Sequence, residues 1–155
     1  MQKNIFMQNK YYTPKIEEFH LGFLYEIKDV EQSAKVGEDV WHTLPYNGNP
    51  KFYVLDSLIE QEEVKVKYLY KEDIEDFGFK ETHVPDEECD LVPGYTFNKS
   101  NILHYVLYVE EGKYVITENK TYDEESGNHF TEVVFKGVIK NKSELHTLLK
   151  QLNII

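Results

Sequence analysis

The sequence contains no arginine, because all 17 of its basic residues are lysines. Against 28 acidic residues this gives a formal charge of -11. Arginine is the side chain best suited to two-pronged recognition of phosphate, and a net negative charge repels nucleic acid. We therefore expect no nucleic-acid partner. The charge is concentrated between residues 51 and 100, which hold 13 acids and 6 lysines.

Cysteine and long apolar runs are almost as scarce. Cys89 is the single cysteine, so no internal disulfide can form and a reducing compartment suits the chain. No run approaches the roughly 18 apolar residues of a membrane-spanning helix, and residues 1–10 are too short and polar for a secretory signal. We expect a cytoplasmic protein with no membrane partner.

Motifs that carry known chemistry are absent as well. The chain has no phosphate-binding glycine loop, no dinucleotide fingerprint and no G-x-S-x-G elbow, and its six histidines form no metal-binding pair on one helix face. The segment from His83 to Asp90 is rich in metal-ligating side chains but lacks the spacing of zinc and calcium sites. We interpret it as a solvated acidic loop, and we expect no enzyme activity, catalytic residue, metal or cofactor.

Aromatic residues, by contrast, are abundant: 12 tyrosines, 9 phenylalanines and one tryptophan. Together with an overall hydrophobic content of 41%, they provide enough apolar surface for a folded core. The length of 155 residues is typical of one domain. We therefore predict a single folded domain over residues 1–155.

Alternating apolar residues and β-branched or aromatic runs predict strands. The predicted strands cover residues 23–28, 52–59, 64–70, 101–109, 113–118 and 130–139. We expect hairpins across residues 60–63 and 110–112, and a bulge at Gly137. Turn-forming residues predict loops at 29–50, with Trp41 as an anchor, at 81–94, which we expect to be mobile, and at 121–128.

Three segments have helical patterns. Residues 13–19 form a brief turn capped by Thr13, and residues 71–78 form a short helix ended by Gly78. The C-terminal helix is capped by Asn141, with Glu144 reaching back to its start. Its apolar stripe consists of Leu145, Leu148, Leu149 and Leu152. The order of elements predicts an α+β fold with a mainly antiparallel sheet of about five to six strands, this amphipathic helix and one or two short helices.

Candidate binding residues are of two kinds. Acidic side chains in the middle third can attract a basic partner surface, although they also serve solubility: Glu72, Asp73, Glu75, Asp76, Asp86, Glu87, Glu88 and Asp90. Tyrosines on alternating strand positions, among them Tyr105 and Tyr108, are typical of protein interfaces, although tyrosine also replaces phenylalanine at strand edges.

Three stretches, residues 11–26, 64–79 and 135–152, carry a resemblance to known proteins. They contain YYTPKIEEFHLGFLYE, VKVKYLYKEDIEDFGF and FKGVIKNKSEL followed by LLKQL. In these stretches the chain resembles a group of small proteins of tailed phages of Bacteroidota, including crAss-like phages, and of their hosts. Tyr70 stands where that group has an aspartate cap. No activity is established for the group, so the resemblance implies origin and not mechanism.

Three functions are compatible with these features. We favour a phage-type accessory protein that binds another protein, from the host or the phage, without turnover. The first alternative is a virion or assembly component, which would self-associate through a tyrosine-rich sheet edge. The second is an acidic DNA mimic that inhibits a host nuclease, which requires carboxylates spaced like phosphates on one rigid face.

Overall fold

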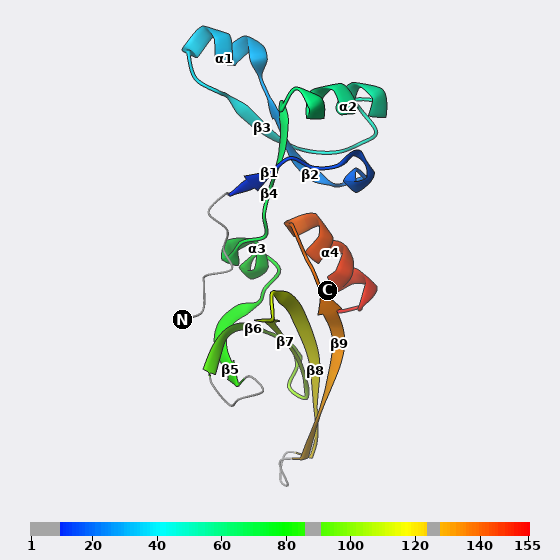
Figure 1. Ribbon diagram of the computed structural model, residues 1–155. Helices are drawn as coiled ribbons and strands as arrows, with labels where there is room; N and C mark the ends of the chain where they lie inside the picture. The colour runs from blue at the N-terminus through cyan, green and yellow to red at the C-terminus, as the bar shows by residue number, and fades with distance from the viewer. Residues whose placement is uncertain (1–9, 86–90, 124–127) are drawn as a thin grey trace. The chain divides into compact units, whose positions relative to one another are not determined.

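A computed structural model describes residues 10–85, 91–123 and 128–155 (Figure 1). It has an α+β fold with two antiparallel sheets, and the chain divides into two compact units. Unit 1 comprises residues 1–68 and 141–143, and unit 2 comprises residues 69–140 and 144–155. The predicted α+β class is confirmed, with the strands shared between two sheets. The single domain stays a prediction, because compact units in one chain can unfold together or separately.

Unit 1 is built on a four-stranded sheet with the order β1-β4-β2-β3. Its elements in chain order are β1 (Tyr11–Tyr12), the 3-10 turn η1 (Ile16–Glu18), β2 (Leu24–Lys28), α1 (Val30–Val36), β3 (Trp41–Pro45), α2 (Phe52–Glu60) and β4 (Val64–Lys67). Its core consists of Phe19, Phe23, Tyr25, Tyr46, Leu55, Val64 and Val66. The β2 strand confirms the prediction for residues 23–28, since Phe23 and Tyr25 alternate into this core.

Two predictions for unit 1 are wrong. The expected loop at 29–50 contains α1 and β3, because the Asp29 carboxylate accepts a hydrogen bond from the Gln32 N–H (2.8 Å) and Gly37 ends α1 with a φ of +79°. The expected strand at 52–59 is α2, so there is no hairpin with β4. Leu55 and Leu58 are three residues apart and both face the core, which is helical spacing.

The brief turn predicted at 13–19 is present as η1, but it begins later than expected. Lys15 and not Thr13 is its N-cap residue. The Glu18 carboxylate accepts a hydrogen bond from the Lys15 N–H (3.0 Å) and another from the Tyr12 hydroxyl (2.8 Å). The Tyr12 oxygen in turn accepts a hydrogen bond from the buried Asn141 side chain (2.9 Å), so residue 141 is held in unit 1.

Unit 2 is built on a five-stranded sheet whose strands follow one another in chain order. Its elements are α3 (Lys71–Glu75), β5 (Lys80–Pro85), β6 (Leu91–Ser100), β7 (Leu103–Glu110), β8 (Lys113–Asp123), β9 (Asn128–Gly137) and most of α4 (Lys142–Gln151). Figure 1 shows α3 and α4 at the same end of this sheet, and the β8–β9 hairpin extends away from them. The predicted short helix at 71–78 and the hairpin across residues 110–112 are confirmed.

The α4 helix carries the predicted leucine stripe. Leu145 and Leu149 are fully buried, and Leu148 and Leu152 are partly buried against the same cluster. That cluster also contains Ile74 of α3 and the sheet residues Tyr95, Tyr105, Leu107 and Ile116. The Glu144 carboxylate does reach back, but it accepts a hydrogen bond from the Lys140 N–H (2.7 Å), one residue before the predicted cap Asn141.

The predicted polar loops of unit 2 are largely strands. Residues 80–85 and 91–100 pair as β5 and β6 within the expected loop at 81–94. The β8 strand runs to Asp123 and β9 begins at Asn128, which shortens the expected loop at 121–128. In β9, Phe135 and Val133 pair with consecutive β8 residues, so the bulge is at Val134 and not at Gly137. Within the described ranges, no helix is both long and apolar enough to cross a membrane.

Candidate interaction surface

The predicted acidic residues of α3 do not form one uniform surface. Asp73 is only 7% exposed, and its carboxylate accepts a hydrogen bond from the Tyr70 N–H (3.0 Å) at the start of the helix. Glu75 lies 3.7 Å from the Lys71 ammonium, which also binds Glu81. Glu72 and Asp76 are exposed. Of the four acids, one therefore serves the fold and one is partly neutralised.

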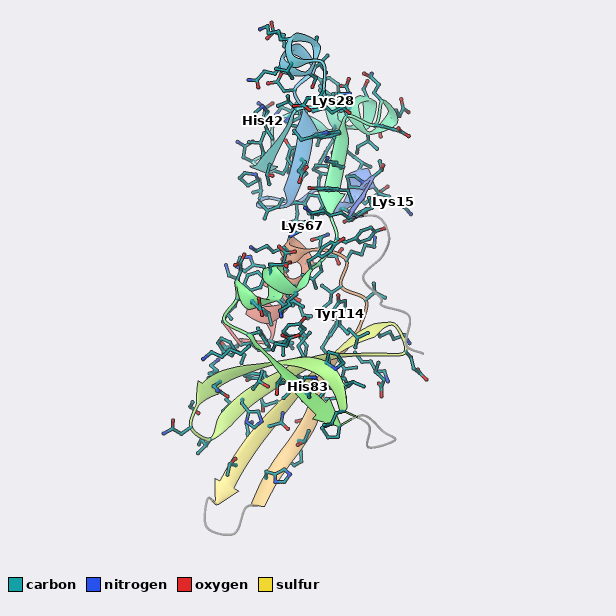
Figure 2. The ribbon with its side chains drawn as sticks, turned by 90° about the vertical axis from the view of Figure 1, so that its left-hand side faces the viewer. Lys15, Lys28, His42, Lys67, His83 and Tyr114 are labelled. Carbon is teal, nitrogen blue, oxygen red and sulfur yellow. The ribbon has the colours of Figure 1, made fainter. Side chains whose placement is uncertain are left out.

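The remaining acidic candidates, Asp86, Glu87, Glu88 and Asp90, lie outside the described residues, as does Cys89. The strand β5 holds His83, the first residue of the ligand-rich segment (Figure 2). Among the residues that the structure describes, no three His, Cys, Asp or Glu side chains come together in a group that could hold a metal ion.

Tyr105 belongs to the core of unit 2 and not to an exposed surface. It is 4% exposed, and its hydroxyl donates a hydrogen bond to the Glu118 carboxylate (2.8 Å). Burial, followed by this hydrogen bond, raises the pKa of Tyr105 to about 12. Burial also raises the pKa of Tyr114, labelled in Figure 2, to about 12. Both phenols favour their neutral form in the fold.

These shifted pKa values predict a loss of stability in alkali. A tyrosine with a folded pKa near 12 and an unfolded pKa near 10 stabilises the fold below pH 10. Above pH 10 the unfolded chain loses its phenolic protons first, so the free energy of unfolding falls as the pH rises from 10 to 12. Urea unfolding at pH 9 and pH 11 measures this fall. We expect a smaller fall in Tyr105→Phe than in the exposed control Tyr53→Phe, and equal falls would contradict the assignment.

Tyr108 lies on the opposite face of the same sheet. Strand register places it between Gly94 of β6 and Val115 of β8, and Val115 is next to Lys136 of β9. Side chains two residues apart on a strand share a face, so the register assigns every strand position to one face or the other. We call the central part of the face with Tyr108 the neutral face.

The neutral face extends over all five strands and contains no Asp, Glu, Lys or Arg. Its members are Thr82, Val84, Val92, Gly94, Thr96, Asn98, His104, Val106, Tyr108, Val115, Thr117, Asn119, Thr121, His129, Thr131 and Val133. Four of them, Val92, Gly94, Val115 and Thr117, are buried, and the others are half-buried or exposed. The helices α3 and α4 contribute to the cluster on the other face.

Charged residues lie at the margin of the neutral face. The Lys136 ammonium forms an ion pair with the Glu110 carboxylate. The register places Lys136 opposite Val115, Glu110 opposite Lys113, and Lys80 of β5 opposite Thr96. Inside the face, the Asn119 amide donates a hydrogen bond to the Thr117 hydroxyl (3.2 Å), and the Thr131 hydroxyl donates one to the Asn119 carbonyl oxygen (2.6 Å). These hydrogen bonds fix the orientations of the three side chains.

Unit 1 has a second feature that sequence reasoning missed. The Lys65 ammonium lies 3.8 Å from the ring centroid of Trp41 and 4.1 Å from that of Tyr11. It also lies 3.4 Å from the Glu26 carboxylate. The three partners come from β3, β1 and β2, so only the strand order, which cannot be read from the sequence, brings them to Lys65 on β4. This cluster occupies the sheet face opposite the core of unit 1.

Replacing Lys65 with methionine is expected to destabilise unit 1. The change removes two cation–π contacts, each worth about 0.5–2 kcal/mol, and leaves the Glu26 carboxylate without its ammonium. Trp41 is the only tryptophan, so its fluorescence reports directly on this cluster. We expect a lower midpoint of thermal unfolding than in Lys35→Met, a control on the exposed side of α1. A change no larger than in that control would show that the cluster adds no stability.

Comparisons with protein-family models, with curated proteins and with solved structures find nothing that matches the chain.

Proposed function

We propose that this chain is a phage-type accessory protein that acts as a non-enzymatic binding module for another protein, from the host or the phage. The observation that carries the proposal is the neutral face of unit 2. Unit 2 holds 8 of the 17 lysines and 17 of the 28 acids, and so a formal charge of -9. Unit 2 carries so much negative charge that an extended surface without charged side chains calls for a physical explanation.

On the sheet face that carries Tyr108, the register places four charged residues near the strand ends, Lys80, Glu110, Lys113 and Lys136. The sixteen positions of the neutral face lie inside this margin and are uncharged. Depletion of charge at the centre with polar groups at the margin is the usual pattern of a protein interface. Half-buried valine, threonine and tyrosine side chains supply contact area, and Asn119 and Thr131 supply directional hydrogen bonds.

This surface favours a partner that presents an uncharged, hydrogen-bonding surface of its own. Binding through such a surface depends little on salt, because no exposed ion pair is formed. Binding through the acidic side chains of α3 would instead weaken as salt screens the charges. Salt dependence therefore separates the neutral face from the acidic-mimic alternative, in which exposed carboxylates of α3 such as Glu72 would make the contact.

The test uses tagged protein and host lysate, with Val106→Lys as the disrupting variant. This change puts a charge at the centre of the neutral face, and Val138→Lys makes the same change at an exposed valine beyond β9. We expect a partner that is retained by the wild type at low and high salt, retained by Val138→Lys and by Glu72→Gln, and lost from Val106→Lys.

Two results would overturn the proposal. Loss of the partner at high salt together with loss from Glu72→Gln would assign binding to the acidic residues. Recovery of the bait alone, with sedimentation showing self-association that Val106→Lys leaves intact, would support the virion or assembly alternative. Unfolding of Val106→Lys is checked by circular dichroism, and Asn98→Asp then replaces it, since Asn98 is exposed and the change keeps its shape.

A further inference from the structure

The edge strand β3 offers unsatisfied backbone groups. It pairs with β2 on one side, and no strand among the described residues pairs with its other side. Just beyond the strand ends, the Asp29 N–H donates to the Val40 carbonyl and the Tyr46 N–H donates to the Phe23 carbonyl, both at 2.8 Å. In an antiparallel ladder, residue pairs that form hydrogen bonds with each other alternate with pairs that do not. The two pairs therefore show which residues of β3 form hydrogen bonds with β2.

This alternation identifies the backbone N–H and C=O groups of β3 that point away from β2. His42 and Leu44 form hydrogen-bonded pairs with Ile27 and Tyr25, so their backbone groups face β2. Trp41 and Thr43 therefore direct both N–H and C=O away from β2, and Pro45 directs only its carbonyl. Figure 2 labels His42 on β3 and Lys28 on the paired strand β2. The outer side of β3 is a short template with two donors and three acceptors.

This edge lacks two features that usually prevent strands from pairing with other chains, namely charged side chains and a bulge. Residues 41–45 include no Asp, Glu, Lys or Arg, and their pairing with β2 shows no bulge. The edge strand β5 carries Lys80 and Glu81, and β9 carries charged residues and a bulge. The remaining edge strand, β1, has only two residues. Natural proteins protect exposed edges by charges, bulges, proline or short length, and of these β3 has only Pro45 at its end and a length of five residues.

The occupant that fits best is an extended segment of another protein. In a second copy, antiparallel pairing centred on Thr43 would place Pro45 opposite Trp41, and proline has no N–H to donate at either end of the ladder. A partner segment has no such restriction. Of the two acids that precede Trp41, Asp39 forms an ion pair with Lys28 (2.6 Å), so the exposed Glu38 is the acid that a basic side chain at that end of the added strand would meet.

We infer that β3 binds another protein by strand addition, through an extended segment of about five residues that is uncharged except for a lysine or arginine at the end that lies beside Trp41. This site is in unit 1 and does not use the neutral face. The two proposals can therefore fail separately. Val106→Lys is expected to disrupt binding at the neutral face and to leave strand addition at β3 intact.

The probe is a library of random twelve-residue peptides, selected on the immobilised full-length chain. We expect selected peptides to share a β-branched, acid-free run with a basic residue at one end. Thr43→Pro removes one outward N–H without touching the β2 ladder, and is expected to weaken binding about tenfold. Thr43→Val changes the side chain but keeps the N–H, so it is the matched control and retains binding.

Hydrogen exchange on the wild-type chain tests the inference without a variant that could unfold. Bound peptide is expected to slow exchange of the Trp41 and Thr43 amides, and to leave the His42 and Leu44 amides unchanged because they are already in the ladder. Equal binding by Thr43→Pro and Thr43→Val, or no slowing at Trp41 and Thr43, overturns the inference. Dimerisation that Thr43→Pro abolishes would overturn it too, in favour of a second copy.

Discussion

Replacing Leu149 with alanine is expected to lower the free energy of unfolding by about 2–5 kcal/mol, the cost of deleting a fully buried leucine side chain from a core. Leu149 lies on α4 in the main cluster of unit 2, together with Leu145 and sheet residues such as Leu107 and Ile116. A domain of this size has a total stability of about 5–15 kcal/mol, so one such change removes a large fraction of it.

Urea unfolding followed by circular dichroism measures the effect, with Leu91→Ala as the control. Leu91 is 69% exposed, so the same truncation there should change stability by less than about 0.5 kcal/mol. The sequence also predicts that Leu148→Asp costs several kcal/mol by placing a charge in the helix–sheet interface. Leu148 is only partly buried, so Leu149→Asp should cost more. Equal midpoints for Leu149→Ala and Leu91→Ala would contradict the packing of α4.

The elements that the sequence predicts correctly are those whose signals are local. In α4 the leucine spacing and the Glu144 contact lie within one segment, and the β7–β8 turn is marked by Gly112. Helix α3 ends near Gly78, which has the positive φ of +88° that favours glycine. None of these features depends on distant parts of the chain, so the pattern alone is sufficient.

The elements that the sequence predicts wrongly are decided by tertiary contacts. Helix α2 contains Tyr53, Val54 and Ile59, residue types with strand preference, and its helical face becomes evident only once Leu55 is buried. The segment at 29–50 is rich in glycine, proline and asparagine, which hides α1 and β3. Pro85 and Pro93 likewise predict a loop where β5 and β6 form paired strands.

The interaction surfaces depend on register, which sequence patterns do not supply. Tyr105 and Tyr108 have similar neighbours in the sequence, yet they point to opposite faces of the sheet because they are three residues apart. Only the pairing of all five strands shows that the positions around Tyr108 form an uncharged face. The open edge of β3 cannot be predicted from the sequence either, because the turn-forming residues at 29–50 predict a loop there.

Replacing Phe23 with alanine is expected to be equally severe for unit 1, at about 3–5 kcal/mol. Phe23 is 1% exposed, and its ring lies 5.0 Å from that of Phe19. The variant also tests the predicted single domain. Trp41, in unit 1, reports the unfolding of that unit by fluorescence, whereas circular dichroism reports both units.

We expect both variants, Phe23→Ala and Leu149→Ala, to shift the same single transition, so that Trp41 fluorescence responds to a cavity in unit 2. The reason is that unit 1 holds the start of α4: the Leu24 N–H donates to the Ser143 hydroxyl (2.9 Å), and Asn141 donates to Tyr12. Unfolding of unit 1 thus releases the first turn of the helix whose leucines fill the core of unit 2. A Trp41 transition that stays in place in Leu149→Ala, while the circular dichroism curve splits in two, would show two independent domains.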